Sequence, residues 1–283
     1  MNQTTRTAKK IAFQGMPGAY SDLACRKVFP QLETIPCETF EDAFAAVNKG
    51  QADLAMIPVD NTIAGRVADV HHLMPKGELF IIKEHFQPIR HALLGVKGAK
   101  TGDLKHIHSH VHAIPQCRKL IKRLGVQAHI HADTAGAAEE IARLQDKSQG
   151  AIASQLAAEI YDLEILERDV QDENHNTTRF LILGPEPETP DLKTPTITSL
   201  LFSVRNIPAA LYKSLGGFAT NGLSLSKLES YVDPNFQAAM FFCDIDGHPE
   251  SKAFQLALEE LGFYAEDVKF LGAYPADDFR KNG

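Results

Sequence analysis

Short apolar segments typical of strands alternate with helical segments along the first two thirds of the chain, and this alternation limits the fold most. Strand-like runs occupy residues 11–15, 33–37 and 53–59, and helical patterns separate them at residues 21–28 and 40–48. A strand–helix–strand rhythm of this kind indicates a parallel sheet with helices packed on its faces. The sequence therefore predicts an α/β fold.

The same rhythm starts again further along the chain. We expect strands at residues 91–97, 105–109, 128–132, 150–154 and 177–184, and helices at residues 112–124 and 134–144. Two consecutive α/β sets predict a region with two lobes. Ligands of open α/β sheets bind beyond the carboxyl ends of the strands, so the cleft between the lobes is the expected site.

A proline-rich segment then interrupts the pattern. Residues 185–195 read PEPETPDLKTP and carry no apolar periodicity, which is typical of a linker. After it we expect strands at residues 197–204, 223–232, 237–246 and 268–275, and helices at residues 208–222 and 250–262. This βαββαβ order is typical of a ferredoxin-like unit. The predicted domains are therefore residues 8–184 and 196–276, joined by the linker.

Charge and hydropathy exclude several classes of function. The chain has 29 Lys and Arg against 36 Asp and Glu, a net charge of −7, whereas nucleic-acid and anionic-membrane partners require a basic surface. We find neither a membrane-spanning apolar run nor a signal-peptide core, and the four cysteines form no C-x-x-C pair. We therefore expect a cytoplasmic protein with free thiols, in which local geometry rather than bulk charge captures any anionic ligand.

Two polar loops follow predicted strands. The Gly15–Ser21 loop has glycines that permit close backbone approach, and Ser21 would begin a helix whose free N–H groups suit an anion, although an ordinary loop explains the segment equally well. Asn61 and Thr62 follow the strand at residues 53–59. They could line a ligand site or simply form an Asx-type turn.

The segment from Asn176 to Phe180 is the most suggestive for function. In an extended segment Asn176, Thr178 and Phe180 share one face, and Arg179 points to the other. Thr178 and Arg179 could reach one ligand only if the strand began near Phe180 or contained a bulge. Otherwise the segment would be an exposed polar strand start, with Arg179 ion-paired at the surface.

The histidines alternate along two predicted strands, at His106, His108, His110 and His112 and at His129 and His131. A zinc site needs three or four converging ligands. Ser109 could begin a helix, which would take the two following histidines off the strand, so we expect no metal site. The chain also lacks the G-x-x-x-x-G-K-[ST], G-x-S-x-G and H-E-x-x-H motifs of phosphoryl transfer, esterase and metalloprotease sites.

Four segments together resemble the prephenate dehydratase family. The family's T-R-F motif is found at residues 178–180, its P-x-E-N-S-x-x-G at 58–65, its G-x-x-G-T-Y-S at 15–21, and its S-H-P-Q-A-L-x-Q-C at 109–117. The resemblance extends from Lys10 to Ala276. It implies a two-lobed, periplasmic-binding-protein-like catalytic domain followed by a ferredoxin-like ACT regulatory domain.

The resemblance also implies an activity, the conversion of prephenate to phenylpyruvate on the route to L-phenylalanine. Aromatisation of the ring drives this reaction, so no cofactor is expected. The family's motifs place catalysis at Thr178, near the leaving hydroxide, and at Arg179, which would hold a carboxylate. The expected substrate-binding residues are Ser21, Asn61, Thr62, Ser109, Ser154, Asn176 and Phe180.

By the same resemblance, the C-terminal unit would bind phenylalanine, and the protein would form a homodimer or a dimer of dimers. The expected effector residues are Asn206, Pro208, Ala209, Leu211, Glu229 and Ser230. The family's G-A-L appears here as residues 209–211, AAL, and its E-S-R-P as residues 229–232, ESYV, which weakens the case for conventional phenylalanine inhibition.

Other departures fall in the catalytic motifs. Asp60 and Thr62 replace Glu and Ser, and Val111 and His112 replace Pro and Gln. Two other functions fit the sequence: an arogenate dehydratase, with the same chemistry on the amino-acid analogue, and a non-catalytic sensor of small molecules.

Overall fold

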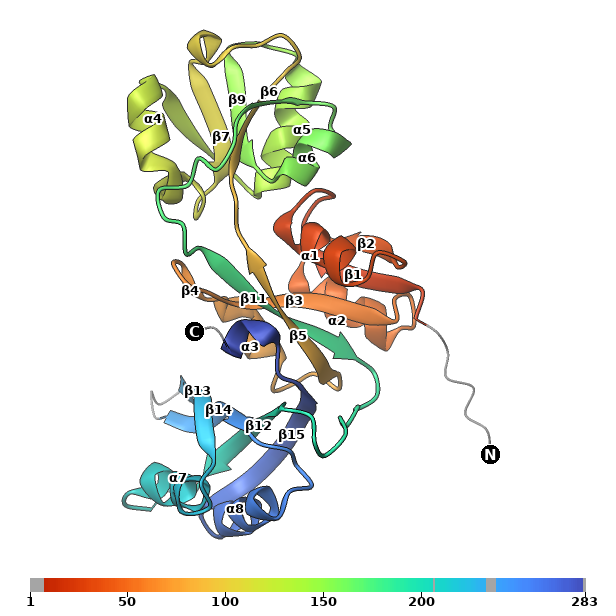
Figure 1. Ribbon diagram of the computed structural model, residues 1–283, viewed down its shortest axis with the longest axis vertical. Coiled ribbons are helices and arrows are strands. Elements are labelled where there is room, and N and C mark those ends of the chain that lie inside the picture. Colours follow the sequence, from red (N-terminus) through yellow and green to blue (C-terminus); the bar gives the residue numbers. More distant parts are fainter. Residues whose placement is uncertain (1–7, 206, 233–237, 282–283) are drawn as a thin grey trace. The chain divides into compact units, whose positions relative to one another are not determined.

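The computed structural model describes residues 8–205, 207–232 and 238–281 (Figure 1). The chain divides into two compact units. The first comprises Met1–Met74 and His85–Phe180, and the second comprises Pro75–Glu84 and Leu181–Gly283. Two strands, β5 (Phe80–Pro88) and β11 (Thr177–Gly184), have residues in both units. The domain boundaries expected from the sequence place residues 75–84 with the first domain, and they stay a prediction.

The N-terminal lobe of the first unit is built on a sheet with the strand order β2-β1-β3-β11-β5. Its elements are β1 (Lys10–Gln14), α1 (Tyr20–Val28), β2 (Glu33–Cys37), α2 (Phe40–Asn48), β3 (Leu54–Asn61), β4 (Gly65–Arg66) and α3 (Ala68–Leu73). Strand β1 pairs in parallel with β2 and β3, as the alternation predicts. Strand β4 pairs with the end of β3 and closes the Asn61 turn.

The other lobe of the first unit has the strand order β10-β6-β9-β7-β8. Its elements are β6 (Ala92–Gly95), β7 (His106–His110), α4 (Arg118–Leu124), β8 (Gln127–His131), α5 (Thr134–Leu144), β9 (Gln149–Ala153), α6 (Gln155–Ile160) and β10 (Glu164–Glu167). Alanines of α5 pack against β6 and β9, and Leu120 of α4 packs against Ile107 and Ile152. Helices therefore cover both faces of this sheet.

Local signals explain several helix starts and correct two expectations. Asp133 caps α5 by accepting from the Gly136 N–H at 2.6 Å. Ser21 does not begin α1, which starts at Tyr20 after an N-cap at Ala19. Ser109 begins no helix either, because it lies within β7 and donates to the Ile152 carbonyl of β9 at 2.6 Å.

The helix expected at residues 112–124 is shorter than predicted. A 3₁₀ turn, Ile114–Cys117, contains Pro115, and α4 begins only after it. Proline lacks an N–H group and favours the first turn of a helical segment, which accounts for the later start.

The second unit has the predicted βαββαβ order. Its elements are β12 (Thr196–Val204), α7 (Ala210–Thr220), β13 (Ser224–Val232), β14 (Ala238–Asp246), α8 (Lys252–Tyr264), β15 (Ala265–Pro275) and a 3₁₀ turn, Asp278–Lys281. The antiparallel strands lie in the order β13-β14-β12-β15. Phe218 of α7 and Phe254 of α8 belong to the core that packs on Phe202. Residues 185–195, all of them described, form neither helix nor strand.

None of the helices in the described ranges is both long enough and apolar enough to cross a membrane.

Candidate active site

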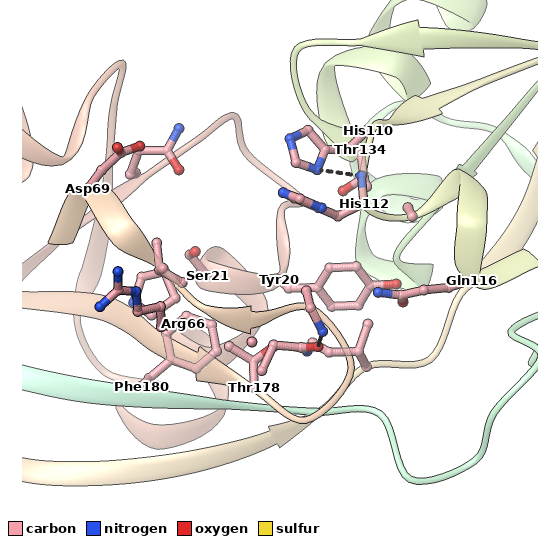
Figure 2. A pocket seen from close by; sticks show the side chains of 18 of the residues that line it. Tyr20, Ser21, Arg66, Asp69, His110, His112, Gln116, Thr134, Thr178 and Phe180 are labelled. Carbon is pink, nitrogen blue, oxygen red and sulfur yellow. Dashed lines mark hydrogen bonds between the residues drawn. The ribbon is translucent and has the colours of Figure 1, made fainter. Parts of the chain in front are cut away.

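A cavity of about 560 Å³ lies in the first unit and is lined by residues of both lobes (Figure 2). Tyr20, Ser21, Asn61 and Arg66 contribute from the N-terminal lobe, and His110, His112, Gln116 and Thr134 contribute from the other. Thr178 and Phe180 of β11 also line it. Its volume is within the range of small-molecule sites, about 300–1,000 Å³. Four of the expected site residues therefore face one cavity: Ser21, Asn61, Thr178 and Phe180.

Asn61 fixes the hydrogen bonding of Thr178. The side-chain oxygen Oδ1 of Asn61 accepts from the backbone N–H groups of Ile63 and Ala64, at 2.9 and 2.8 Å. Its Nδ2 therefore faces β11 and donates to Thr178 Oγ1 at 2.9 Å. Asn61 thus forms an Asx-type turn and also lines the cavity, so both interpretations of this segment apply. Because Thr178 Oγ1 accepts from Asn61, its own hydrogen is available for an acceptor in the cavity.

Asn176 and Thr62 make further hydrogen bonds next to the Asn61–Thr178 pair. Asn176 is 1% exposed, and its Oδ1 accepts from Asn61 Nδ2 at 2.8 Å. The Thr62 hydroxyl donates to the His175 carbonyl at 2.8 Å and accepts from the Thr177 N–H at 3.0 Å. Neither side chain lines the cavity. Both join the end of β3 to the start of β11.

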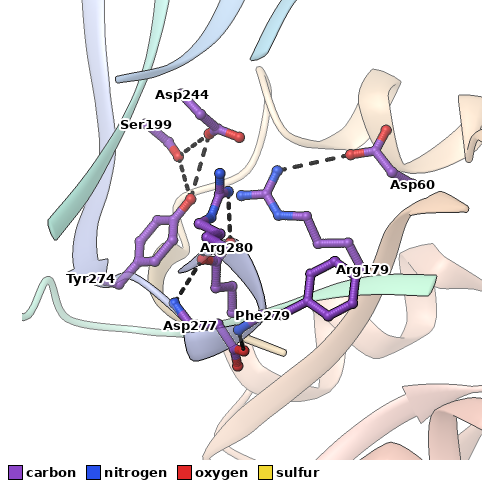
Figure 3. Close-up of polar contacts among 9 residues, drawn as sticks. Asp60, Arg179, Ser199, Asp244, Tyr274, Asp277, Phe279 and Arg280 are labelled. Atoms are coloured by element: carbon purple, nitrogen blue, oxygen red, sulfur yellow. Dashed lines mark hydrogen bonds and ion pairs between the residues drawn. The ribbon is translucent and has the colours of Figure 1, made fainter. Parts of the chain in front are cut away.

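Arg179 does not line the cavity, and its side chain is directed toward Asp60 (Figure 3). Strand β11 begins at Thr177, so Arg179 alternates to the face opposite Thr178 and Phe180. Its side chain is 7% exposed and lies 3.8 Å from the Asp60 carboxylate. The ion pair of the alternative interpretation is present, but it is buried and not at the surface as expected. The carboxylate-binding role of Arg179 stays a prediction. Arg66, which directly follows the motif at residues 58–65, is an arginine that does line the cavity.

Ser109 and Ser154 are also absent from the cavity lining, and both side chains are fully buried. Ser154 caps α6 by accepting from the Ala157 N–H at 3.0 Å, and it donates to the Gly18 carbonyl at 2.5 Å. Gly18 has a φ of +89°, and a Cβ there would lie 2.8 Å from the Ala157 Cα. The hydroxyls of both serines bond to backbone groups, and the substrate-binding role expected for them stays a prediction.

His110 and His112 face the cavity with their ring centroids 5.1 Å apart. Burial lowers the pKa of His110, and the neighbouring His112 lowers it further. His106 and His129 form a separate pair, with Nδ1 and Nε2 2.9 Å apart. In the described part of the chain, no three His, Cys, Asp or Glu side chains are grouped so as to hold a metal ion.

Comparison with known proteins decides the family. The sequence model of the prephenate dehydratase family matches residues 11–188. The chain belongs to this family. It is accordingly a hydro-lyase of the prephenate and arogenate dehydratase group.

Three relatives illustrate the range of this family. A bifunctional N-acyl-homoserine lactone acylase/prephenate dehydratase of Komagataeibacter europaeus is 49% identical, over 96% of this chain and 97% of the relative. Arogenate dehydratase/prephenate dehydratase 1 of Arabidopsis thaliana is 39% identical, over 95% of this chain and 72% of the relative. The crystal structure of prephenate dehydratase from Arthrobacter aurescens in complex with L-Phe is 28% identical, with a TM-score of 0.88 over 95% and 90% of the chains.

The likeness to this solved prephenate dehydratase confirms the expected fold class. The chain has a two-lobed, periplasmic-binding-protein-like domain followed by a ferredoxin-like βαββαβ unit of the ACT type. Family motifs could have drawn attention to Tyr20 and Gln116, which lie within them and line the cavity. No sequence signal identified Arg66 or Thr134.

The expected effector residues lie in two places in the ACT-type unit. Pro208, Ala209 and Leu211 are at the start of α7, and Ala209 has a φ of +59° where the family motif has glycine. Glu229 and Ser230 are neighbours on β13 and so point to opposite faces, with Glu229 3.6 Å from Lys227. Asn206 lies outside the described residues.

Proposed function

We propose that this protein catalyses the decarboxylating dehydration of prephenate to phenylpyruvate in L-phenylalanine biosynthesis. The observation that carries the proposal is the Thr178 hydroxyl, whose oxygen accepts from Asn61 at 2.9 Å and whose hydrogen is left for an acceptor in the cavity. The reaction expels CO₂ and hydroxide, and hydroxide is a poor leaving group. A donor held close to the departing oxygen lowers that barrier.

The Thr178 hydroxyl can act on the departing oxygen as a hydrogen-bond donor. In our proposal it hydrogen-bonds the departing oxygen as negative charge develops there, which stabilises the transition state. Arg66 would pair with a carboxylate of the substrate, and Ser21 in the first turn of α1 would donate to it. Decarboxylation and loss of hydroxide leave an aromatic ring, so the reaction needs no cofactor.

The direct test is turnover by the purified protein. We expect it to form phenylpyruvate from prephenate, followed by absorbance. Arogenate is assayed in parallel by release of phenylalanine, because relatives of this chain are named arogenate dehydratases and the two substrates differ only at the side-chain terminus. Turnover of arogenate alone would replace the substrate in this proposal. Turnover of neither substrate would contradict the proposal and favour a non-catalytic sensor.

A second activity, hydrolysis of N-acyl-homoserine lactones, is supported by one feature of the cavity. A relative that is 49% identical over 96% of this chain is named as both an acylase and a prephenate dehydratase. His112 lines the cavity beside His110 at the position where the family motif has glutamine. A neutral imidazole there could take a proton from water as the water attacks the amide carbonyl, and return it to the leaving amine.

The acylase proposal is tested by measuring homoserine lactone and fatty acid released from an N-acyl-homoserine lactone. The matched variant is His112→Gln, which restores the family-motif residue and removes the base. We expect acylase turnover to fall by at least about 10²-fold while prephenate turnover persists. Equal acylase rates in the two proteins would exclude His112 as the base.

We further propose that phenylalanine binds at the ACT-type unit, that the protein is a homodimer or a dimer of dimers, and that it acts in the cytoplasm. The Arthrobacter aurescens relative was crystallised with L-Phe, which supports the effector. An exposed edge of the antiparallel sheet would be covered by pairing with a second copy. Calorimetric titration with phenylalanine tests the effector site, and light scattering tests the oligomeric state. Absence of heat, or a monomeric mass, would contradict them.

A further inference from the structure

A chain of hydrogen bonds extends from Thr178 to Tyr20, and its direction can be assigned because the backbone fixes one end. Two backbone N–H groups hold Asn61 Oδ1, so Asn61 Nδ2 must be the atom that faces Asn176. An amide nitrogen donates and does not accept. Asn176 therefore presents its oxygen to Asn61 and its nitrogen to Gln116, whose Oε1 lies 2.5 Å away.

The orientation of Gln116 then determines the tautomer of His91. The same Gln116 Oε1 lies 3.0 Å from His91 Nε2. A carbonyl oxygen only accepts, so His91 must carry a hydrogen on Nε2. The His91 side chain is 3% exposed, and burial lowers the pKa of its ring, which favours the neutral form. The neutral ring has one N–H group, so Nδ1 is left as an acceptor.

Tyr20 supplies the donor for that acceptor. Its hydroxyl donates to the Arg90 carbonyl at 2.9 Å and lies 2.8 Å from His91 Nδ1, so its single hydrogen serves both acceptors, and the Tyr20 and His91 rings meet edge to face. Burial raises the pKa of Tyr20 well above its usual value, so the hydroxyl keeps its hydrogen. His91 and Asn176 thus both donate to Gln116 Oε1, and the Tyr20 hydroxyl contacts His91 on its other ring nitrogen.

This hydrogen-bond network lies where two segments of the polypeptide pass between the lobes. One segment joins β5 to β6 and contains Ile89 and His91, and the other joins β10 to β11 and contains Gln171 and Asn176. Two hydrogen bonds join these segments. The Ile89 N–H donates to the Asn176 carbonyl, and the His91 backbone N–H donates to Gln171 Oε1, both at 2.9 Å. A side-chain network at this place can transmit the position of one lobe to a residue of the other.

We propose that His91 is a positioning residue of the dehydratase, and that its Nε2–H holds Gln116 and Asn176 in the orientation that Asn61 and Thr178 need. The inference rests on the proposed dehydratase function, because it treats the Thr178 hydroxyl as the donor to the leaving oxygen. His91 itself lines the cavity, but in this proposal it acts through Gln116 and Asn176 rather than by contact with the substrate. Since the donor matters chiefly in the transition state, loss of its orientation lowers kcat and leaves KM nearly unchanged.

Two substitutions at one position test the proposal. His91→Leu removes both ring nitrogens, and His91→Gln keeps an N–H group that can reach Gln116. We expect kcat to fall about 10- to 100-fold in the leucine variant, with KM within about twofold, and to recover largely in the glutamine variant. Equal losses in both variants, or a loss confined to KM, would overturn the proposal.

A matched control is available in the second unit. His248 is also a buried histidine, and it lies 2.8 Å from the Pro190 carbonyl. His248→Leu removes a buried imidazole without touching the network, so we expect its kcat to stay near wild type. A kcat loss as large as that of His91→Leu would mean that general destabilisation explains both, which would overturn the proposal.

A spectroscopic readout keeps the proposal testable if His91→Leu does not fold. Nitrogen-15 NMR of the intact protein should show His91 as the Nε2–H tautomer, assigned by its disappearance in His91→Gln. Tyr20→Phe removes the donor to Nδ1 and should shift His91 toward a mixture of tautomers with a lower kcat. An Nδ1–H tautomer in the wild type would overturn the assignment. If neither prephenate nor arogenate is turned over, the dehydratase proposal fails, while the tautomer still reports on the network.

Discussion

Replacing Arg280 with methionine should destabilise the second unit by about 3 kcal/mol. Arg280 lies in the last 3₁₀ turn and makes a bidentate ion pair with Glu84 of β5 (Figure 3). Its Nε is 2.6 Å from Glu84 Oε1, and its Nη2 is 2.9 Å from Glu84 Oε2. The two side chains are 20% and 0% exposed, respectively. The substitution would leave the Glu84 carboxylate buried without its bidentate arginine partner.

The size of the effect follows from that burial. Removing one partner of a buried ion pair typically costs about 3–5 kcal/mol, because the remaining charge has lost both water and its partner. The partial exposure of Arg280 and the Asp277 N–H, which donates to Glu84 Oε1 at 3.1 Å, place the cost at the lower end, about 3 kcal/mol. Adding Glu84→Gln to Arg280→Met should recover part of this loss, since it removes the buried charge.

The assay is urea unfolding followed by far-UV circular dichroism, which suits a chain with no tryptophan. The matched control is Lys281→Met in the same turn, since Lys281 pairs with Asp278 at 2.6 Å but both side chains are largely exposed. Exposed pairs contribute little, so the control should unfold like the wild type. If Arg280→Met were no more destabilising than Lys281→Met, the ion pair would not be the constraint that we infer.

Three further outcomes are expected. Ala209→Gly should stabilise the protein by about 0.5–1 kcal/mol in the same assay, because Ala209 occupies the left-handed region at φ +59°; a loss of stability would contradict this. Ser154→Ala should cost about 1–2 kcal/mol of stability while KM for prephenate stays unchanged, and a large rise in KM would support its substrate-binding role. Burial raises the pKa of Cys117 and of Cys243 to about 12, so neither thiol should react with a disulfide reagent in native protein at pH 8, and rapid labelling would contradict their burial.

Most of the fold could be predicted because its signals are local. Helices α2 and α5 have the predicted bounds, since capping residues, Thr39 and Asp133, stand before apolar helical patterns. Strand β5 was not predicted. Glu84 lies within it, and a buried carboxylate makes sense only once Arg280, 196 positions away, is placed beside it. Long-range pairing of this kind leaves no local pattern.

In the candidate site, too, some features could be predicted from local sequence patterns, and others depend on long-range contacts. Asn61 and Thr178 were predicted because they lie at strand ends and in family motifs, and they are hydrogen-bonded in the structure. The alternation of an extended segment predicted that Arg179 faces away from Thr178, whereas the motif alone grouped the two. Ser109 and Ser154 have the right residue type, but their hydroxyls bond to backbone groups that only the folded chain brings near.

The central claim is that the Thr178 hydroxyl stabilises the departing oxygen, and the kcat of Thr178→Val tests it most directly. Valine keeps the branched shape of threonine and removes the hydroxyl, both as the donor to the departing oxygen and as the acceptor of the Asn61 Nδ2–H, while Asn61 keeps its bond to Asn176. Circular dichroism verifies that the variant is folded. We expect kcat for phenylpyruvate formation to fall by at least about 10²-fold in this variant and to be largely retained in Thr178→Ser. A Thr178→Val protein with nearly wild-type kcat would contradict the account.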